Sequence, residues 1–151
     1  MKKPDKTIIA LVGNPNTGKS TLFNKITGAR SAVGNLAGIT VEACSAPGII
    51  SGSENWALVD LPGIYNLHAQ TDDGRVTEDA LINPGGKWNP DVILLIADKS
   101  TLQGQLFLAL QIIELEIPCI LLLNRMNYET ADSQLCEILE KGIGIPVREI
   151  Q

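Results

Sequence analysis

The sequence predicts an α/β fold with a mostly parallel sheet of six strands and helices on both of its faces. Short apolar bursts of strand length, "IIALV", "VILLIA" and "IPCILLL", alternate with stretches that have helical periodicity, as in repeated strand–helix–strand units. The bursts are continuously apolar, which is typical of strands buried on both faces of a parallel sheet. The chain has 151 residues, the size of one domain. We therefore expect a single domain over residues 1–151.

The first part of the chain is expected to contain one strand, one helix and a long loop. Residues 6–12 form the expected strand, and residues 19–27 form a helix that ends near Gly28. Residues 29–40 are polar and rich in glycine, so we expect little regular structure there. A loop of this length inside a compact domain is usually functional or mobile.

Four further strands are expected before the carboxyl-terminal one. Residues 41–50 and 55–61 are expected to form an antiparallel hairpin, because "SGSE" between them is rich in turn-forming residues. Residues 91–97 and 117–123 are continuous apolar runs and are expected at the centre of the sheet. The segment "GIPVREI" is expected to form the last strand.

Two helices are predicted by the spacing of large apolar residues. Between the two central strands, such residues recur at spacings of four and three, at Leu102, Leu106, Leu110 and Ile113. This spacing predicts one apolar face of an amphipathic helix. Leu135, Ile138 and Leu139 repeat the pattern in a shorter helix, which we expect Gly142 to end.

Composition and charge disfavour several classes of protein. No apolar run approaches the roughly 18 residues that suggest a transmembrane helix, and the apolar run after "MKKPDK" is too short for an exported leader. The net charge of -5 argues against broad binding to nucleic acid. Cys44, Cys119 and Cys136 lack metal-binding spacing, so we expect reduced thiols.

The stretch "GNPNTGKS" fits the phosphate-binding loop G-x-x-x-x-G-K-[ST], and it lies between a predicted strand and a predicted helix. Its members are Gly13, Asn14, Pro15, Asn16, Thr17, Gly18, Lys19 and Ser20, with Thr21 directly after. Backbone N–H groups of such a loop turn inward around phosphate oxygens, and the helix start adds its positive dipole end. Lys19 is expected to reach the β and γ phosphates, and the Ser20 hydroxyl to bind Mg²⁺.

Two further stretches are placed to complete a magnesium and phosphate site. "DLPG", comprising Asp60, Leu61, Pro62 and Gly63, ends a predicted strand. Asp60 is expected to hold Mg²⁺ through water, and the Gly63 N–H to meet a γ-phosphate. Thr40 closes the glycine-rich passage, and its hydroxyl is expected to complete the Mg²⁺ shell when that passage folds over the phosphate.

These motifs together resemble the G domain of small GTPases, and more narrowly the amino-terminal domain of the ferrous iron transport protein B family. The resemblance lies in "GNPNTGKSTLFNKITG", "VGNLAGITVE", "LVDLPGIYNL" and "LQIIELEIPCILLLNRMN". It implies a P-loop small-GTPase-like fold that binds GTP and GDP and hydrolyses GTP slowly. It also implies a domain of a bacterial membrane protein, itself soluble, at the cytoplasmic face of the inner membrane. The implied partner is a transmembrane iron-permease region further along the same protein.

The resemblance also implies roles for individual residues. Catalytic roles fall to Asn16, Lys19, Thr40 and Gly63. Mg²⁺ is held by Ser20, Thr40 and Asp60, and an activating K⁺ by Asn16 with backbone oxygens near Gly34 and Asn35. The nucleotide site further includes Gly38, Ile39, Asn124, Arg125, Met126 and Asn127. Ile64 stands where many GTPases have a glutamine that orients water, so no side-chain general base is expected.

The base-reading stretch "NRMN" departs from the family pattern of Asn, two variable residues and Asp. The acid normally accepts two hydrogen bonds from guanine. Asn127 has one acceptor oxygen and an NH₂ donor instead. Hydrogen bonds to charged groups contribute about 1.5 to 3 kcal/mol, so GTP binding is expected to be weaker by roughly one to two orders of magnitude. Xanthine, with a carbonyl in place of the exocyclic amino group, suits the amide better.

Three functions stay open on the sequence alone. The first is a Mg²⁺-dependent, K⁺-stimulated GTPase that regulates iron transport. The second is a degenerate nucleotide-binding module with little turnover, for which Asn127 is the discriminating residue. The third is a GTPase that assists ribosome or tRNA maturation, which the net charge of -5 disfavours.

Overall fold

The computed structural model describes all residues except 1–6, 28–31, 37–38, 45–55, 69, 84–87 and 126–129, and it describes the backbone but not the side chains over 32–36 and 39–44. The elements in chain order are β1 (Thr7–Gly13), α1 (Lys19–Thr27), β2 (Ala32–Leu36), β3 (Ile39–Cys44), β4 (Trp56–Asp60), α2 (Asp72–Ile82), β5 (Val92–Asp98), the 3₁₀ turn η1 (Lys99–Thr101), α3 (Leu102–Ile113), β6 (Cys119–Asn124), α4 (Ser133–Ile143) and β7 (Val147–Ile150).

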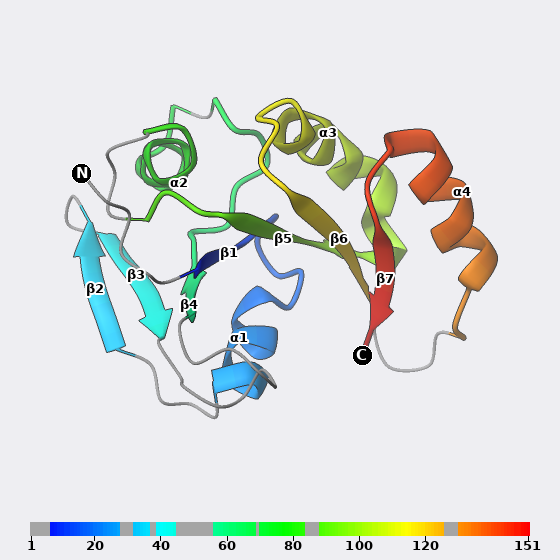
Figure 1. Cartoon of the computed structure of the whole chain (residues 1–151), viewed down its shortest axis with the longest axis horizontal. Helices are drawn as coiled ribbons and strands as arrows, with labels where there is room; N and C mark the ends of the chain where they lie inside the picture. The colour runs from blue at the N-terminus through cyan, green and yellow to red at the C-terminus, as the bar shows by residue number, and fades with distance from the viewer. Residues whose placement is uncertain are drawn as a thin grey trace.

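The strands form one sheet in the order β2-β3-β4-β1-β5-β6-β7 (Figure 1). The five strands from β4 to β7 in that order are mutually parallel. Strands β2 and β3 pair antiparallel with each other, and β3 pairs antiparallel with β4. The predicted α/β class and the predicted hairpin are therefore confirmed. The sheet has seven strands, so the expectation of six was wrong by one.

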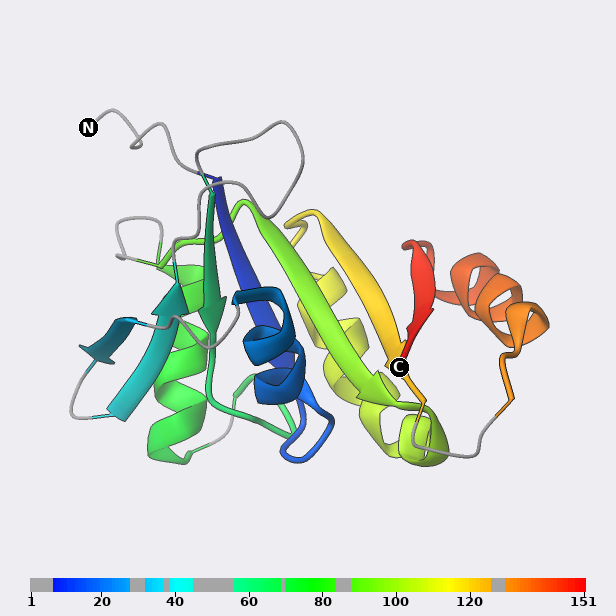
Figure 2. The ribbon, with the colours of Figure 1, turned by 90° about the horizontal axis from the view of Figure 1, so that it is seen from below.

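Helices cover both faces of the sheet, with α1 on one face and α2 and α3 on the other (Figures 1 and 2). Successive residues of a strand point to opposite faces, and β1 shows this directly. Leu11 packs with Phe23 of α1 in the smaller apolar cluster. Ala10 and Val12 belong to the larger cluster, which contains residues of α2 and α3. The core is thus split by the sheet into two layers.

The extra strand is β2, which lies inside the stretch expected to be a loop. Its register with β3 sets Leu36 opposite Ile39, so only two residues separate the strands. Two-residue connections between antiparallel strands favour glycine, and the sequence there reads Ala-Gly. The glycine-rich composition of residues 29–40 was therefore a poor guide to the backbone.

Helix α2 was not predicted at all. Its buried side consists of small or short side chains, Gly74, Val76, Thr77 and Ala80, together with Leu81. Such a face gives little apolar periodicity. A start signal was nevertheless present, because the Thr71 hydroxyl accepts a hydrogen bond from the Gly74 N–H at 3.1 Å and two aspartates follow Thr71.

The predicted helices α3 and α4 exist, but details of each prediction were wrong. The buried side of α3 is Gln105, Leu108, Ala109 and Ile112. Leu110 is 50% exposed, because it points away from the sheet. Helix α4 continues past Gly142 and ends at Gly144, whose φ of 76° is left-handed and whose N–H donates to the Glu140 carbonyl at 2.9 Å. Ile138 is 60% exposed.

Among the described residues, no helix combines the length and the apolar character required to cross a bilayer.

Candidate functional site

The phosphate-binding loop runs from the end of β1 at Gly13 to the start of α1 at Lys19. Two of its residues, Asn16 and Gly18, have left-handed φ values of 64° and 94°. The Thr17 hydroxyl donates a hydrogen bond to the Asn14 carbonyl at 2.9 Å. These features bend the chain into a tight ring that ends on the positive end of the α1 dipole, which is a ready site for an anion.

Gly18 combines a left-handed backbone with a close neighbour, and both favour glycine. A Cβ atom there would overlap with Nδ2 of Asn124, at the end of β6. That amide donates a hydrogen bond to the Thr17 carbonyl at 2.9 Å. Asn124 therefore ties the loop to β6, two strands away from β1 in the sheet.

Lys19 is a buried cation, only 8% exposed. Burial lowers the pKa of its ammonium group, and the nearby Asp60 carboxylate acts in the opposite direction. A buried charge needs a partner of opposite sign. An anion held by the loop would supply that partner, as the motif predicts.

Ser20 at the start of α1 and Asp60 at the end of β4 are in contact, as expected of magnesium ligands. The Ser20 hydroxyl, on α1, donates to Oδ2 of Asp60 at the end of β4, with 2.7 Å between the oxygens. Asp60 is 8% exposed. Hydroxyl and carboxylate oxygens are hard donors of the kind that Mg²⁺ prefers, with water completing the shell. The pair therefore fits a magnesium ion.

The stretch from Asp60 to Ile64 lies directly against the phosphate loop. The Leu61 N–H donates to the Leu11 carbonyl at 3.2 Å, and the Ile64 N–H donates to the Gly13 carbonyl at 3.1 Å. A Cβ atom at Gly63 would lie 2.9 Å from Pro15 Cα and 3.2 Å from Lys19 Nζ. Gly63 is thus close to the lysine that is expected to hold the γ-phosphate.

Two neighbours of Gly63 also have clear positions. The Thr77 hydroxyl of α2 donates to the Pro62 carbonyl at 3.1 Å, which fixes this turn from the other side. Ile64 is 2% exposed and belongs to the larger core cluster. Its side chain is therefore turned away from solvent and cannot orient water.

The predicted nucleotide-site residues Gly38, Ile39 and Thr40 are described only in part. Ile39 and Thr40 begin β3, and Gly38 lies outside the described residues. Because β3 runs antiparallel to β4 with Glu42 opposite Asp60, Thr40 is displaced towards the edge of the sheet where Asp60 ends its strand. The side chain of Thr40 is outside the description, so its magnesium role stays a prediction.

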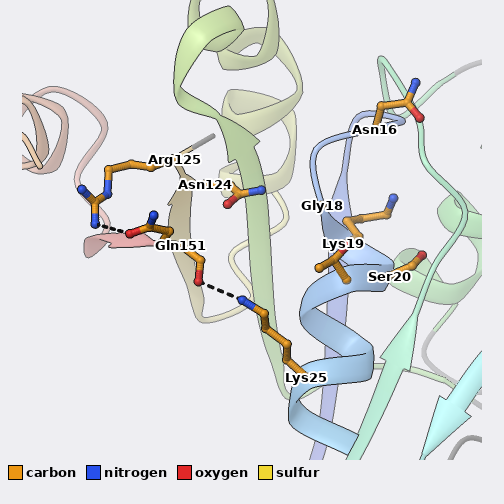
Figure 3. Close-up of a pocket in the computed structure, with 9 residues that line it drawn as sticks. Asn16, Gly18, Lys19, Ser20, Lys25, Asn124, Arg125 and Gln151 are labelled. Carbon is orange, nitrogen blue, oxygen red and sulfur yellow. Dashed lines mark hydrogen bonds between the residues drawn. The ribbon is translucent and has the colours of Figure 1, made fainter. Parts of the chain in front are cut away.

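The potassium site is also a prediction that the structure leaves open. Asn16 is exposed and lies at the turn of the phosphate loop (Figure 3). The backbone of Gly34 and Asn35 is part of β2, where these residues pair with Val41 and Thr40. Strand β2 is the outermost strand, separated from β1 by β3 and β4.

A cavity of about 480 Å³ opens between the start of α1 and the ends of β6 and β7 (Figure 3). It is lined by Asn16, Gly18, Lys19, Ser20, Thr21, Lys25, Asn124, Arg125 and Gln151. Seven of these were predicted to bind nucleotide. Asn14 and Pro15 instead line a separate hollow beside Tyr65. Met126 and Asn127 lie outside the described residues.

Sequence reasoning missed Lys25 and Gln151. Lys25 lies one helical turn after Thr21, so both point to the same side of α1. Its ammonium donates to the main-chain oxygen of Gln151 at 3.1 Å. Gln151 follows β7, and the ends of parallel strands meet at one edge of the sheet. The position of Gln151 directly after a predicted parallel strand could therefore have indicated that it lies near the site.

Comparison with known proteins places these features in a family. Residues 7–151 match the family described as "Ferrous iron transport protein B". The chain is 40% identical over 145 residues to the Fe(2+) transporter FeoB of Shigella flexneri, and 39% identical over 145 residues to that of Escherichia coli strain K12. Each alignment covers 94% of this chain and 18% of the transporter.

Solved structures agree with the sequence matches. The G domain of FeoB from T. maritima superposes with a TM-score of 0.81 at 30% identity, covering 95% of this chain and 86% of that one. A GDP-bound mutant of NFeoB from S. thermophilus gives a TM-score of 0.77 at 35% identity, covering 95% of this chain and 55% of that one.

Proposed function

Because this chain belongs to the ferrous iron transport protein B family, as its G domain, we propose that it binds GTP and GDP with Mg²⁺ and hydrolyses GTP slowly. One observation supports this above all. The buried Lys19 and the hydrogen bond between Ser20 and Asp60 occur together, and Lys19 and Ser20 line the same cavity. These groups match the cation and the oxygen ligands that a nucleotide triphosphate with magnesium requires.

Each residue has a defined task in the proposed reaction. Backbone N–H groups of the loop from Gly13 to Ser20 bind the phosphates, and Lys19 neutralises the charge that develops on them. The Gly63 N–H meets the γ-phosphate. Ser20 and Asp60 would hold magnesium, whose charge would offset the negative charge of the phosphates.

We further propose that no side chain acts as general base. Ile64 is buried and apolar, so the attacking water has to be oriented by backbone groups and by Thr40. Positioning and charge stabilisation then supply the catalysis, which is typical of phosphoryl transfer. Asn16 would hold the activating K⁺, whose charge would act as an arginine finger does.

Regulation of iron transport is proposed from the relatives. They are named Fe(2+) transporters, and this chain spans 18% of their length. We propose that the domain acts on a transmembrane iron-permease region of the same protein, at the cytoplasmic face of the bacterial inner membrane. A net charge of -5 does not suit a nucleic-acid partner.

Phosphate release from GTP tests the enzymatic proposal. We expect slow, Mg²⁺-dependent release that is faster in KCl than in NaCl, and loss of release in Lys19→Ala. Lys141→Ala is the matched control, because Lys141 is exposed on α4, away from the cavity. Binding of GTP without any release would instead favour the degenerate nucleotide-binding module.

Asn127 is the residue that bears on guanine selectivity, because it replaces the usual acid. Titration calorimetry with GTP, XTP and ATP, on the native protein and on Asn127→Asp, addresses it. We expect Asn127→Asp to bind GTP roughly ten- to a hundredfold more tightly. An unchanged affinity for GTP would remove the argument for relaxed selectivity.

A further inference from the structure

Charged and polar contacts run without interruption along the edge of the cavity that lies away from Lys19 and Ser20 (Figure 3). Gln151 accepts from Arg125 Nη2 through its side-chain oxygen at 3.2 Å and from Lys25 Nζ through its main-chain oxygen at 3.1 Å. Arg125 Nε in turn lies 3.9 Å from Oε2 of Glu149. Glu149 itself does not line the cavity but contacts Arg125, which does.

Glu149 is the centre of this group of contacts. It lies on β7, and its side chain is 12% exposed. Oε1 is 3.1 Å from Lys99 Nζ, and Oε2 accepts from the Asp132 N–H at 3.0 Å. The Asp132 N–H, and then the Lys99 ammonium, lower the pKa of the Glu149 carboxyl. The carboxylate therefore holds three different segments at once.

Two of those segments, at Arg125 and at Asp132, lie on either side of residues 126–129 in the sequence, and the third is η1, which carries Lys99. On one flank, the Arg125 N–H donates to the Ile150 carbonyl at 2.9 Å. On the other flank, Lys99 Nζ donates to the Thr130 carbonyl at 2.9 Å. Asp132 is the N-cap of α4 and accepts from the Leu135 N–H at 2.9 Å. Both flanks are thus fixed to β7 through Glu149 or its immediate neighbours.

We propose that Glu149 is a positioning residue for recognition of the nucleoside, because it contacts Arg125, which lines the cavity beside Asn124 and Gln151. The inference rests on the proposed nucleotide function. Glu149 acts through Arg125 and Gln151, and it does not touch the ligand. Groups that orient a binding residue contribute through the geometry they maintain.

A purely structural tie between β7 and α4 is the competing explanation, and the chain offers a matched control for it. Glu140 of α4 accepts from the Val147 N–H at 2.8 Å and from Arg148. Its carboxyl pKa is lowered by the same two kinds of partner, a backbone N–H and a basic side chain. Glu140 does not line the cavity. Glu149→Gln removes a contact to Arg125, which lines the cavity, whereas Glu140→Gln removes similar contacts to residues that do not line it.

The experiment compares binding of whole nucleotides with binding of tripolyphosphate, in the presence of Mg²⁺. The dissociation constant for tripolyphosphate divided by that for the nucleotide reports what the nucleoside adds to the affinity. For Glu149→Gln we expect this ratio to fall about tenfold, with little change in the affinity for tripolyphosphate. For Glu140→Gln we expect the wild-type ratio. Thermal unfolding of each variant shows whether it is folded at the assay temperature.

Lys99→Met provides a second variant in case Glu149→Gln does not fold. It removes another partner of the same carboxylate and should lower the ratio in the same direction by a smaller factor. An unchanged ratio in the folded variants would overturn the inference, and so would an equal fall in Glu140→Gln. A wild-type ratio near one would overturn both the inference and the guanine proposal. Preference for another purine, with the expected fall in Glu149→Gln, would overturn the guanine proposal alone.

Discussion

Gly18 is the residue at which backbone conformation and the site are most tightly linked. Its φ is 94°, and a Cβ atom would overlap with the Asn124 amide that holds the Thr17 carbonyl. For Gly18→Ala we expect the free energy of unfolding to fall by about 1–2 kcal/mol because of the left-handed backbone alone. The overlap with Asn124 should lower it further. Nucleotide binding should weaken with it.

Gly142→Ala is the control for that substitution. Gly142 lies within α4, and nothing surrounds the place of its Cβ within 4 Å. Alanine there should stabilise the protein by roughly 0.5–1 kcal/mol. Denaturant unfolding measures both changes. Equal stabilities of the two variants would show that the packing around Gly18 imposes no constraint.

Lys19 gives a pH dependence whose sign follows from its pKa. Burial lowers that pKa below its ordinary value of 10.5, so between the folded and unfolded values the unfolded chain binds more protons. Stability should therefore rise with pH across this window. Relative to Lys19→Met, the unliganded wild type should be destabilised at neutral pH and should recover as the pH approaches 10.5. Thermal unfolding of both proteins from neutral to alkaline pH measures the difference, and a constant difference would contradict the assignment.

At the scale of elements, α3 shows which apolar positions carry stability. Ile112 is fully buried in the larger core cluster, whereas Leu110 is 50% exposed. Truncation of a buried isoleucine to alanine typically costs about 2–5 kcal/mol, and we expect Ile112→Ala to fall in this range. Leu110→Ala should change stability by less than about 0.5 kcal/mol. Urea unfolding of the two variants gives both values, and similar losses would mean that Leu110 is covered in solution.

The same helix shows which features of the fold sequence patterns predict and which they miss. Strands β1, β5 and β6 were found because they are continuously apolar, and the phosphate loop was found because its spacing is fixed by phosphate geometry. The inward side of α3 includes the polar Gln105, which accepts from the Asp98 N–H at 2.9 Å inside the protein. A pattern of apolar spacing does not register such a residue. The β2 strand depends on pairing with β3, and the Glu149 contacts join segments that are distant in the sequence. Local periodicity encodes neither.

At the scale of the whole molecule, the site joins parts of the sheet that are far apart in the sequence. The phosphate loop follows β1, Asp60 ends β4 and Asn124 ends β6. A nucleotide bound with magnesium would engage all three, so it should stabilise the folded chain as one unit. A ligand that binds only the folded state adds about 2.7 kcal/mol at 100 times its dissociation constant.

For a chain of this size, that free energy corresponds to a rise of roughly 5 to 10 °C in the unfolding temperature. We expect GDP with Mg²⁺ to raise it by such an amount. Pyrophosphate with Mg²⁺ at the same concentration should raise it less, because pyrophosphate leaves the base end of the cavity without contacts. Lys19→Ala should lose both shifts, since Lys19 is placed to bind the phosphates that the two ligands share. Equal shifts for GDP and pyrophosphate would mean that Asn124 and Arg125 add nothing to affinity, and that the anion site alone stabilises the fold.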